Sequence, residues 1–188
     1  ALLDGDASIK TEGNMTVGQV SLQGANRTAT LEASEGISRD LGRTVASSYI
    51  SADNLVLKAG SYIGDTGVTS DQDRIRVSAN NLTATGSGNI DIIEAGNAEL
   101  TDRELTVKRV ATTEGNVSLV STGNMNVDTI EASGAGKGVV LAAVDGQILN
   151  ARTDAQANIT ASTLAMRGHQ GIGGTKALNV NVATLAAD

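Results

Sequence analysis

Hydrophobic and polar residues alternate along this chain in short stretches that are separated by frequent turn residues. The recurring unit is a Gly-Asn pair followed by an apolar-x-apolar triplet, as in residues 115–119 (Gly-Asn-Val-Ser-Leu). An alternation of period two places the two apolar side chains on one face of a strand and the middle side chain on the other. The unit occurs at residues 13–17, 88–92, 96–100, 115–119 and 123–127. Each occurrence predicts a short strand that begins directly after a tight turn.

The Gly-Asn pairs are expected to form the corners between strands. Glycine reaches positive φ angles without a steric penalty, and asparagine tolerates the left-handed region and bonds to nearby backbone. Equivalent asparagines stacked at one corner also form hydrogen-bonded ladders, so Asn89, Asn97, Asn116 and Asn124 are expected to stabilise turns. The predicted corner residues are Gly13, Asn14, Gly88, Asn89, Gly96, Asn97, Gly115, Asn116, Gly123 and Asn124.

Short strands separated by frequent corners predict an all-β solenoid. Apolar spacing of three and four is not sustained, so no substantial α-helix is expected. Strands of this length favour a parallel β-helix, in which one coil contains two or three strands; with roughly 20 residues per coil, the chain would form about nine coils. In this fold Asp91, Ser118 and Val140 should point outward. The residues expected to point inward are Ile90, Ile92, Val117, Leu119, Val139 and Leu141.

A longer repeat overlies the short one. The sequence Gly-Asn-Met-Thr-Val at residue 13 returns as Gly-Asn-Met-Asn-Val at residue 123, an offset of 110 (123 − 13). The sequence Leu-Val-Leu-Lys at residue 55 returns as Leu-Ala-Met-Arg at residue 164, an offset of 109 (164 − 55). We therefore predict one solenoid over residues 1–188 that contains two similar super-repeats, about 7–110 and 117–188, of which the second is truncated. Irregular composition at about 38–51 and 65–73 predicts two protruding loops.

The composition restricts the kind of core that the chain can build. The 188 residues contain 22 Gly but no Cys, Pro, Trp or Phe, and two Tyr. Without large aromatic side chains, the interior must be a narrow one filled by aliphatic residues, which suits a stack of coils. Disorder is the alternative interpretation of a Gly-rich chain, and the regular alternation argues against it.

The charge and the residue types exclude several kinds of partner. The formal net charge is −7 and the pI is about 4.7, which argues against general binding to nucleic acid or to anionic lipid. The absence of cysteine excludes disulfides and thiolate metal sites. No apolar run approaches the roughly 20 residues that a membrane-spanning helix needs, so no membrane insertion is expected.

At this point the chain resembles a known family. The alternating strands with Gly-Asn punctuation, together with residues 55–65 (Leu-Val-Leu-Lys-Ala-Gly-Ser-Tyr-Ile-Gly-Asp) and 144–148 (Val-Asp-Gly-Gln-Ile), resemble the repeat regions of filamentous haemagglutinin-like exoproteins. These are giant adhesins of Gram-negative bacteria, commonly exported by two-partner secretion. The resemblance implies a right-handed parallel β-helix that acts as a stalk or adhesive fibre on the cell surface. Because the family's amino-terminal secretion domain is missing, it also implies an interior segment of a longer chain.

Enzymatic chemistry has few candidate residues. His169, the only histidine, lies in a corner by composition and is expected to be an exposed turn residue. Parallel β-helices also carry polysaccharide-cleaving sites, which use two carboxylates as acid and base or nucleophile. Two groups of carboxylates are candidates for this role: Asp71 and Asp73 in one predicted loop, and Asp91, Glu94, Glu99 and Asp102, which lie near one another in sequence. Sugar-binding sites usually provide an aromatic platform, for which only Tyr49 and Tyr62 are available, so we expect no enzyme.

Calcium binding is a second alternative. Asp65, Asp71 and Asp73 supply hard oxygen ligands in one predicted loop, but the nonapeptide of calcium-loaded β-rolls and the EF-hand loop are both absent. A metal site and a cofactor are therefore not expected. A calcium- or glycan-binding module that uses the loops at 38–51 and 65–73 remains the alternative function.

The expected function is structural and adhesive. Stacked coils convert sequence length into reach and offer extended sides for weak, multivalent contact. Neither terminus carries an evident cap, and uncapped strands template further pairing. The expected partners are flanking coils of a longer parent chain, a second copy bound end to end, and a receptor or glycan on a host or neighbouring cell. The expected location is the bacterial cell surface.

Overall fold

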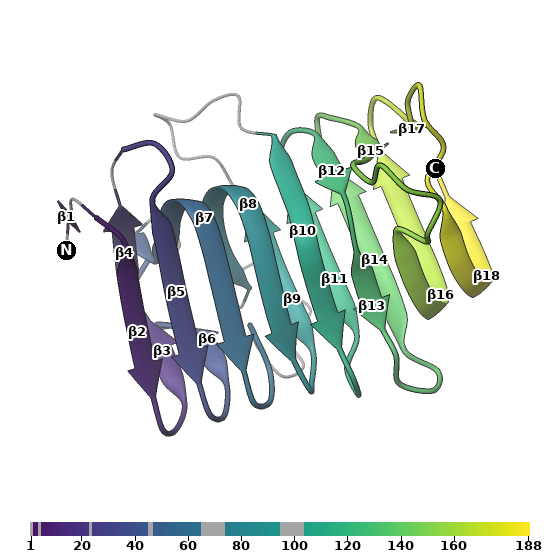
Figure 1. Ribbon diagram of the computed structural model, residues 1–188. Helices are drawn as coiled ribbons and strands as arrows, with labels where there is room; N and C mark the ends of the chain where they lie inside the picture. The colour runs from purple at the N-terminus through teal and green to yellow at the C-terminus, as the bar shows by residue number, and fades with distance from the viewer. Residues whose placement is uncertain (1, 4, 23, 45–46, 65–73, 95–103) are drawn as a thin grey trace.

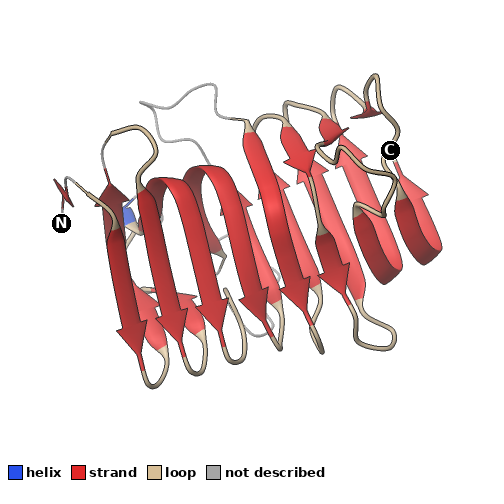
Figure 2. Cartoon of the chain, in the orientation of Figure 1, coloured by secondary structure: helices blue, strands red, loops and turns tan. Residues whose placement is uncertain are grey.

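The computed structural model describes residues 2–3, 5–22, 24–44, 47–64, 74–94 and 104–188. In these ranges the chain forms strands that pair in parallel throughout (Figure 1). Apart from a 3₁₀ position at Ser47, the described ranges contain no helix (Figure 2). The predicted all-β, parallel solenoid class is therefore confirmed. The strands are β1 (Leu2–Leu3), β2 (Ala7–Thr11), β3 (Met15–Val17), β4 (Gln19–Leu22), β5 (Thr28–Ala33), β6 (Ile37–Arg39), β7 (Tyr49–Ala59), β8 (Ile75–Gly86), β9 (Ile90–Glu94), β10 (Leu105–Thr112), β11 (Val117–Ser121), β12 (Met125–Val127), β13 (Ile130–Ala132), β14 (Gly138–Ala143), β15 (Ile148–Asn150), β16 (Ile159–Gly168), β17 (Ile172–Gly173) and β18 (Val180–Ala187).

Two parallel sheets enclose the interior. The front sheet stacks β2, β5, β7, β8, β10, β13, β16 and β18 in chain order, with β12, β15 and β17 continuing from β10 beside them. The back sheet runs from β9 through β11 and β14 to the second part of β16. In Figure 1 the front strands run downward, the chain passes behind at the lower edge and rises again while it advances to the right, which is the path of a right-handed coil.

The N-terminal half has an additional side. There β1, β4 and the first residues of β7 and β8 pair with one another, and β8 then pairs with β9 through Ile75 and Ile92. This third side thus merges into the back sheet at β8 and β9. Consequently the coil is three-sided before residue 94 and flatter after residue 104.

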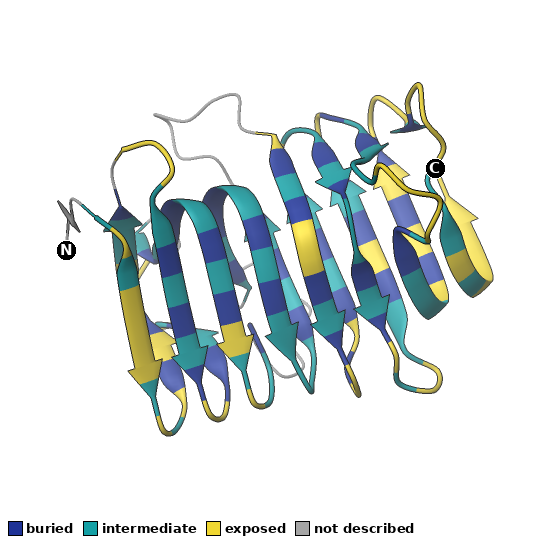
Figure 3. Cartoon of the chain, in the orientation of Figure 1, coloured by how far each residue is buried: buried dark blue, intermediate teal, exposed yellow. Residues whose placement is uncertain are grey.

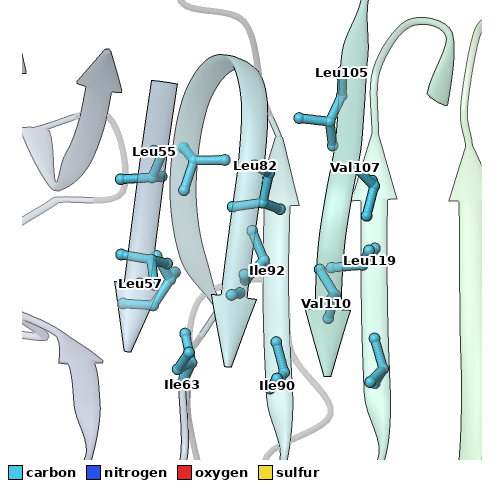
Figure 4. Packing of buried hydrophobic residues seen from close by; sticks show 14 of the residues in the cluster. Leu55, Leu57, Ile63, Leu82, Ile90, Ile92, Leu105, Val107, Val110 and Leu119 are labelled. Atoms are coloured by element: carbon cyan, nitrogen blue, oxygen red, sulfur yellow. The ribbon is translucent and has the colours of Figure 1, made fainter. Parts of the chain in front are cut away.

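The core consists of aliphatic residues that point inward and stack in columns, two of which are named the front column and the back column (Figure 4). Parallel strands in register place equivalent residues above one another, so that each coil adds one residue to each column. The front column consists of Ile9, Leu31, Leu57, Ala84, Val110, Ile130, Ile159 and Val180. The back column consists of Met15, Ile37, Ile63, Ile90, Val117, Val139, Leu164 and Leu185.

The predicted number of nine coils is wrong. The front column spans 171 residues (180 − 9) in seven steps, so a step takes on average more residues than the 20 assumed. Steps range from 20 residues (Val110 to Ile130) to 29 (Ile130 to Ile159), because connections of very different length join the strands. The coils are consequently fewer and longer than predicted.

The predicted inward and outward positions are confirmed. All six residues expected inside, among them Ile90, Leu119 and Leu141, are at most 1% exposed. Of the residues expected outside, Asp91 and Ser118 are partly buried and Val140 is half exposed, as the banding along the strands in Figure 3 illustrates. The period-two reading therefore assigned the faces correctly.

The connections differ between the two sides of the solenoid. The lower side in Figure 1, here called the short-turn edge, consists of residues 12–14, 34–36, 60–62, 87–89, 113–116 and 133–137. The remaining connections, here called the long-loop side, lie toward the top of the figure and include residues 24–27, 40–44, 151–158 and 174–179. Longer segments therefore enter this solenoid on one side.

Candidate functional site

The Gly-Asn pairs in the described part of the chain lie in connections between strands, but they do not share one corner. Asn14, Asn89 and Asn116 lie on the short-turn edge directly before β3, β9 and β11, whereas Asn124 lies before the front strand β12. Asn124 is therefore not stacked on Asn89 and Asn116 as predicted. Gly96 and Asn97 lie outside the described residues.

The corner asparagines link successive coils through side chain and backbone. The Asn116 N–H donates to Oδ1 of Asn89 at 2.9 Å, and the Gly138 N–H donates to Oδ1 of Asn116 at 2.9 Å. The Gly36 N–H donates to Asn14 in the same way, and the Gln147 N–H donates to Asn124. Each bond satisfies a backbone donor of the next coil that the turn would otherwise leave open. The contact is thus side chain to backbone, not the amide-to-amide ladder expected.

One of the corner glycines, Gly115, is required by the close approach of two coils. Gly13, Gly88 and Gly115 do not have positive φ angles, so the predicted left-handed role is wrong at these positions. A Cβ atom on Gly115 would lie 2.1 Å from the backbone carbon and oxygen of Gly88. Glycine is needed at Gly115 because successive corners are stacked backbone on backbone.

The carboxylates considered for catalysis or metal binding do not gather in a site among the described residues. Asp91 is paired with Arg74 at 2.7 Å, and Arg74 also donates to Oγ of Ser118. Glu94 is 1% exposed and accepts hydrogen bonds from the hydroxyls of Ser121 and Thr122. The described ranges hold no group of three His, Asp or Glu residues that could bind a metal ion. The carboxylates that lie outside these ranges are Asp65, Asp71, Asp73, Glu99 and Asp102.

The histidine and the tyrosines lie apart from one another in the fold. His169 is exposed in the turn between β16 and β17. The ring of Tyr62 packs over Gly36 on the short-turn edge, and its hydroxyl donates to Oδ1 of Asn14 at 3.3 Å. The hydroxyl of Tyr49 accepts from Gln19. Tyr49 thus ties its coil to the preceding one, and Tyr62 reaches across the preceding coil to the one before it.

Arg39 occupies an inward position in the predicted 38–51 loop. It is the last residue of β6, stacks on Val17 and is 6% exposed. Its Nη1 donates to the carbonyl of Arg43 at 3.3 Å, while its Nε has no hydrogen-bond partner among the residues that the structure describes. The loop at 65–73 lies outside the described residues. An inward arginine at this point was not predicted, because period two alone places an apolar residue there.

The connection 151–158 contains a polar network that was missed. Nε and Nη2 of Arg152 donate to the two carboxylate oxygens of Asp154 at 2.7 and 2.8 Å, and Nη1 donates to Oγ1 of Thr129 at 2.6 Å. The hydrogen bond from Arg152, with a backbone bond from Gln156, lowers the pKa of Asp154 from 3.8 to about 2. The hydrogen bond to Asp154 in turn raises the pKa of Arg152. This paired network holds the loop on the solenoid.

Asn158, at the end of that loop, is buried and holds the loop on the solenoid through hydrogen bonds. It is 0% exposed, and its Nδ2 donates to the carbonyl of Val127 at 2.7 Å and to Oδ1 of Asn150 at 2.9 Å. Its Oδ1 accepts from the Asn179 N–H of the next coil. A buried amide with both ends satisfied fixes three consecutive coils relative to one another.

The first and last described coils each have an open strand edge and a partly exposed interior residue. Among the described residues, β2 pairs with β5 alone and β18 with β16 alone, so each has one open edge. Ile9 and Leu185 face the interior in the two columns, yet they are 43% and 51% exposed. Their neighbours in the columns, Leu31 and Leu164, are 1% and 2% exposed. At each of these edges, backbone groups are unpaired and apolar surface is exposed, which are the features that a further coil would bind.

Comparison with protein-family models, curated proteins and solved structures found no match. Within the described residues, no helix has the length and apolar character needed to cross a membrane.

Proposed function

We propose that this chain is a structural segment of a fibre on the bacterial cell surface, in the manner of the filamentous haemagglutinin-like exoproteins that its repeats resemble. The observation that carries the proposal is the pair of aliphatic columns, which run from Met15 and Ile9 at one end to Leu185 and Val180 at the other. Every coil repeats the same interior, so the chain gains length with each step. The expected activity is mechanical.

The arrangement of the strands suits such a role. Each inter-strand hydrogen bond points along the solenoid axis, and each step adds roughly 4.8 Å of length. Each coil packs mainly on its neighbours, which lets a long, thin body form without a globular core. Polar residues on the outer faces, such as Lys58 and Arg109, leave these faces open to weak and repeated contacts with a receptor or glycan on another cell.

The carboxylates support a non-catalytic role. A glycosidase needs two carboxyl groups that face one substrate. Asp91 is held by Arg74, and Glu94 is enclosed by Ser121 and Thr122. These contacts suit carboxylates that stabilise a structure.

Labelling of intact source cells tests the proposal. Antibodies against the purified chain, used in immunogold electron microscopy, should mark filaments that project from unpermeabilised cells, and protease treatment of these cells should remove the label. A cytoplasmic marker provides the control for intact membranes. Labelling that appears only after permeabilisation would refute a surface role.

A further inference from the structure

We infer that Tyr62 and the polar side chains beside it form a binding site for a neutral sugar on the short-turn edge. The inference deepens the proposed fibre role and rests on it for its purpose, because a surface stalk that makes weak, repeated contacts needs a ligand and a place to bind it. Its structural basis is separate. An aromatic ring lies flat on the outside of the fold, and two planar polar groups stand at its rim.

The ring of Tyr62 lies face down over Gly36, an arrangement here called the tyrosine platform. A Cβ atom on Gly36 would lie 2.3 Å from Cε1, 2.3 Å from Cζ and 2.7 Å from Cε2 of the ring, and distances so similar place this point above the ring face. Gly36 directly precedes the inward residue Ile37, so its own Cβ direction is outward. The ring therefore covers the corner from outside and turns its other face away from the core.

Hydrogen bonds to Asn14 hold the tyrosine platform in place. The Tyr62 hydroxyl donates to Oδ1 of Asn14 at 3.3 Å, and this oxygen also accepts from the Gly36 N–H at 2.9 Å. Gly36 is buried beneath the ring, whereas Tyr62 itself is partly exposed. A ring that is fixed before a ligand arrives loses little conformational entropy on binding. A partly exposed aromatic face of this kind suits the stacking of a pyranose ring through its C–H groups.

Asn14 and Glu35 supply polar groups at the rim of the platform. Both side chains are exposed, and Nδ2 of Asn14 donates to Oε2 of Glu35. Among the described residues, the second N–H of this amide and Oε1 of Glu35 make no further hydrogen bond. One group is a donor and the other an acceptor. Because each sugar hydroxyl both donates and accepts, an amide and a carboxylate side by side can bind two neighbouring hydroxyls.

The local charge favours a neutral sugar. Three corners build the site, at residues 12–14, 34–36 and 60–62, and their charged side chains are Glu12 and Glu35 alone. Both side chains are exposed. A sulfated or carboxylated sugar would meet like charge there, and like charges brought together discriminate against a partner. The ligand class is therefore an uncharged hexopyranose, either terminal or within a chain.

The platform departs from the turn chemistry of its edge. The residues that directly precede the back column from Met15 to Val139 are Asn14, Gly36, Tyr62, Asn89, Asn116 and Gly138. The asparagines at 89 and 116 each bind a backbone N–H of the next coil. Tyr62 instead folds back over the side-chain-free Gly36. An aromatic residue at this one corner is what a binding role accounts for.

Nuclear magnetic resonance of the purified chain tests the inference. The chain contains two tyrosines and no Phe or Trp, so apart from His169 its aromatic signals come from Tyr49 and Tyr62. Cellopentaose, mannopentaose and lacto-N-neotetraose serve as neutral probes, and a heparin hexasaccharide serves as the acidic probe. At about 5 mM, which suits weak binding, at least one neutral probe should shift the ring signals of Tyr62 and receive saturation transfer from them. The Tyr49 signals should not move, and the heparin probe should leave Tyr62 unshifted.

Three variants locate the binding on the platform. Tyr62→Leu keeps an apolar cover on Gly36 but removes the flat ring, so it should weaken binding about tenfold or more. Glu35→Gln replaces the charged acceptor that Asn14 orients, and it should weaken binding about threefold or more. Glu114→Gln changes an exposed carboxylate elsewhere on the same edge and should bind like the wild type. Melting temperatures show whether each variant is folded.

Neutral probes that leave Tyr62 unshifted would overturn the inference, and the wild-type spectra decide this even if a variant does not fold. Binding that survives in a folded Tyr62→Leu variant would overturn it too, as would tighter binding of the heparin probe than of the neutral ones. Labelling of intact cells is a separate measurement. Loss of the sugar site would leave the fibre proposal standing, and loss of surface labelling would leave the sugar site standing.

Discussion

The short-turn edge and the long-loop side connect successive strands in different ways. Both must carry the chain from one strand to the next, and on the short-turn edge this takes three residues before β3 and five before β14. There the backbone itself is stacked: the Ser61 N–H donates to Glu35, the Gly88 N–H donates to Ser61, and the Glu114 N–H donates to Ser87, at 2.7–2.9 Å. Side chains are excluded where corners touch, which explains Gly115.

On the long-loop side the connections vary in length, and side-chain hydrogen bonds hold them on the solenoid. The eight residues of the 151–158 connection are held by Arg152, Asp154 and the buried Asn158. Backbone stacking thus restricts residue size at one edge, whereas side-chain networks permit insertions at the other. New binding surface can accordingly be added on the long-loop side without altering the core that both sides share.

The largest loss of stability is expected for a substitution in the interior, which both sides of the solenoid share. Leu119→Asp places a charge among Ile92, Leu141 and their neighbours, so it should lower the free energy of unfolding by more than about 3 kcal/mol. Val140→Asp, on the outward face of the adjacent strand, should change it by less than about 0.5 kcal/mol. Urea denaturation followed by circular dichroism measures both. Equal losses would mean that the assigned faces are wrong.

The second largest loss of stability is expected for a substitution on the short-turn edge, and this substitution tests the backbone stacking there. Gly115→Ala forces a methyl group into the backbone of Gly88, so it should cost about 2–4 kcal/mol. Gly13→Ala is the matched control, because Gly13 has ordinary φ and nothing within 4 Å of a Cβ atom. It should be neutral within about 0.5 kcal/mol in the same denaturation experiment. A tolerated Gly115→Ala would remove the proposed difference between the two sides.

A smaller loss is expected on the long-loop side. Asn158→Ala leaves the Asn179 N–H without its buried acceptor, while the Val127 carbonyl keeps only the bond from the Ala151 N–H, at a cost of about 2 kcal/mol. Hydrogen exchange should speed up at Asn179, whereas corners of the short-turn edge such as Gly88 should keep their protection. The exposed Asn181→Ala serves as the control. Uniform loss of protection would instead show that both sides open as one unit.

The smallest effect concerns the Arg152–Asp154 pair. The pKa of Asp154 falls on folding from 3.8 to about 2, so the pair stabilises the fold above pH 3.8 and this contribution disappears as the pH falls through about 2. Asp154→Asn should lower the melting temperature at pH 6 by about 2 °C or less, and the difference from wild type should vanish near pH 2. Thr153→Ala, in the same loop, should show no pH-dependent difference. Thermal melts across this range decide the point.

The alternation of apolar and polar residues with period two supplied most of the predictions that the sequence allows. It placed Val117, Leu119 and Ile92 inside because neighbouring strands in register repeat the same alternation. It could not count coils, since a count depends on connection lengths, and the 29-residue step from Ile130 to Ile159 looks no different in composition from the shorter ones.

The polar contacts were the hardest to predict. Gly-Asn pairs mark a turn but not the side of the solenoid, which is why Asn124 was grouped with Asn89 and Asn116. Arg39 and Glu94 occupy inward positions that alternation alone assigns to apolar residues. Arg152 and Asp154 are two residues apart, but their partners Thr129 and Asp128 come from another coil. Such partners become neighbours only through the fold.

The two aliphatic columns also determine how chains of this kind can change in length. Leu31 and Leu57 are 26 residues apart and occupy the same place in successive coils. Duplication or deletion of one such block would return every following residue to an equivalent position, with the interior and the strand faces preserved. An insertion of a single residue within β11 would instead turn Leu119 outward and Ser118 inward. The coil is therefore the natural unit in which this protein can lengthen or shorten over evolution.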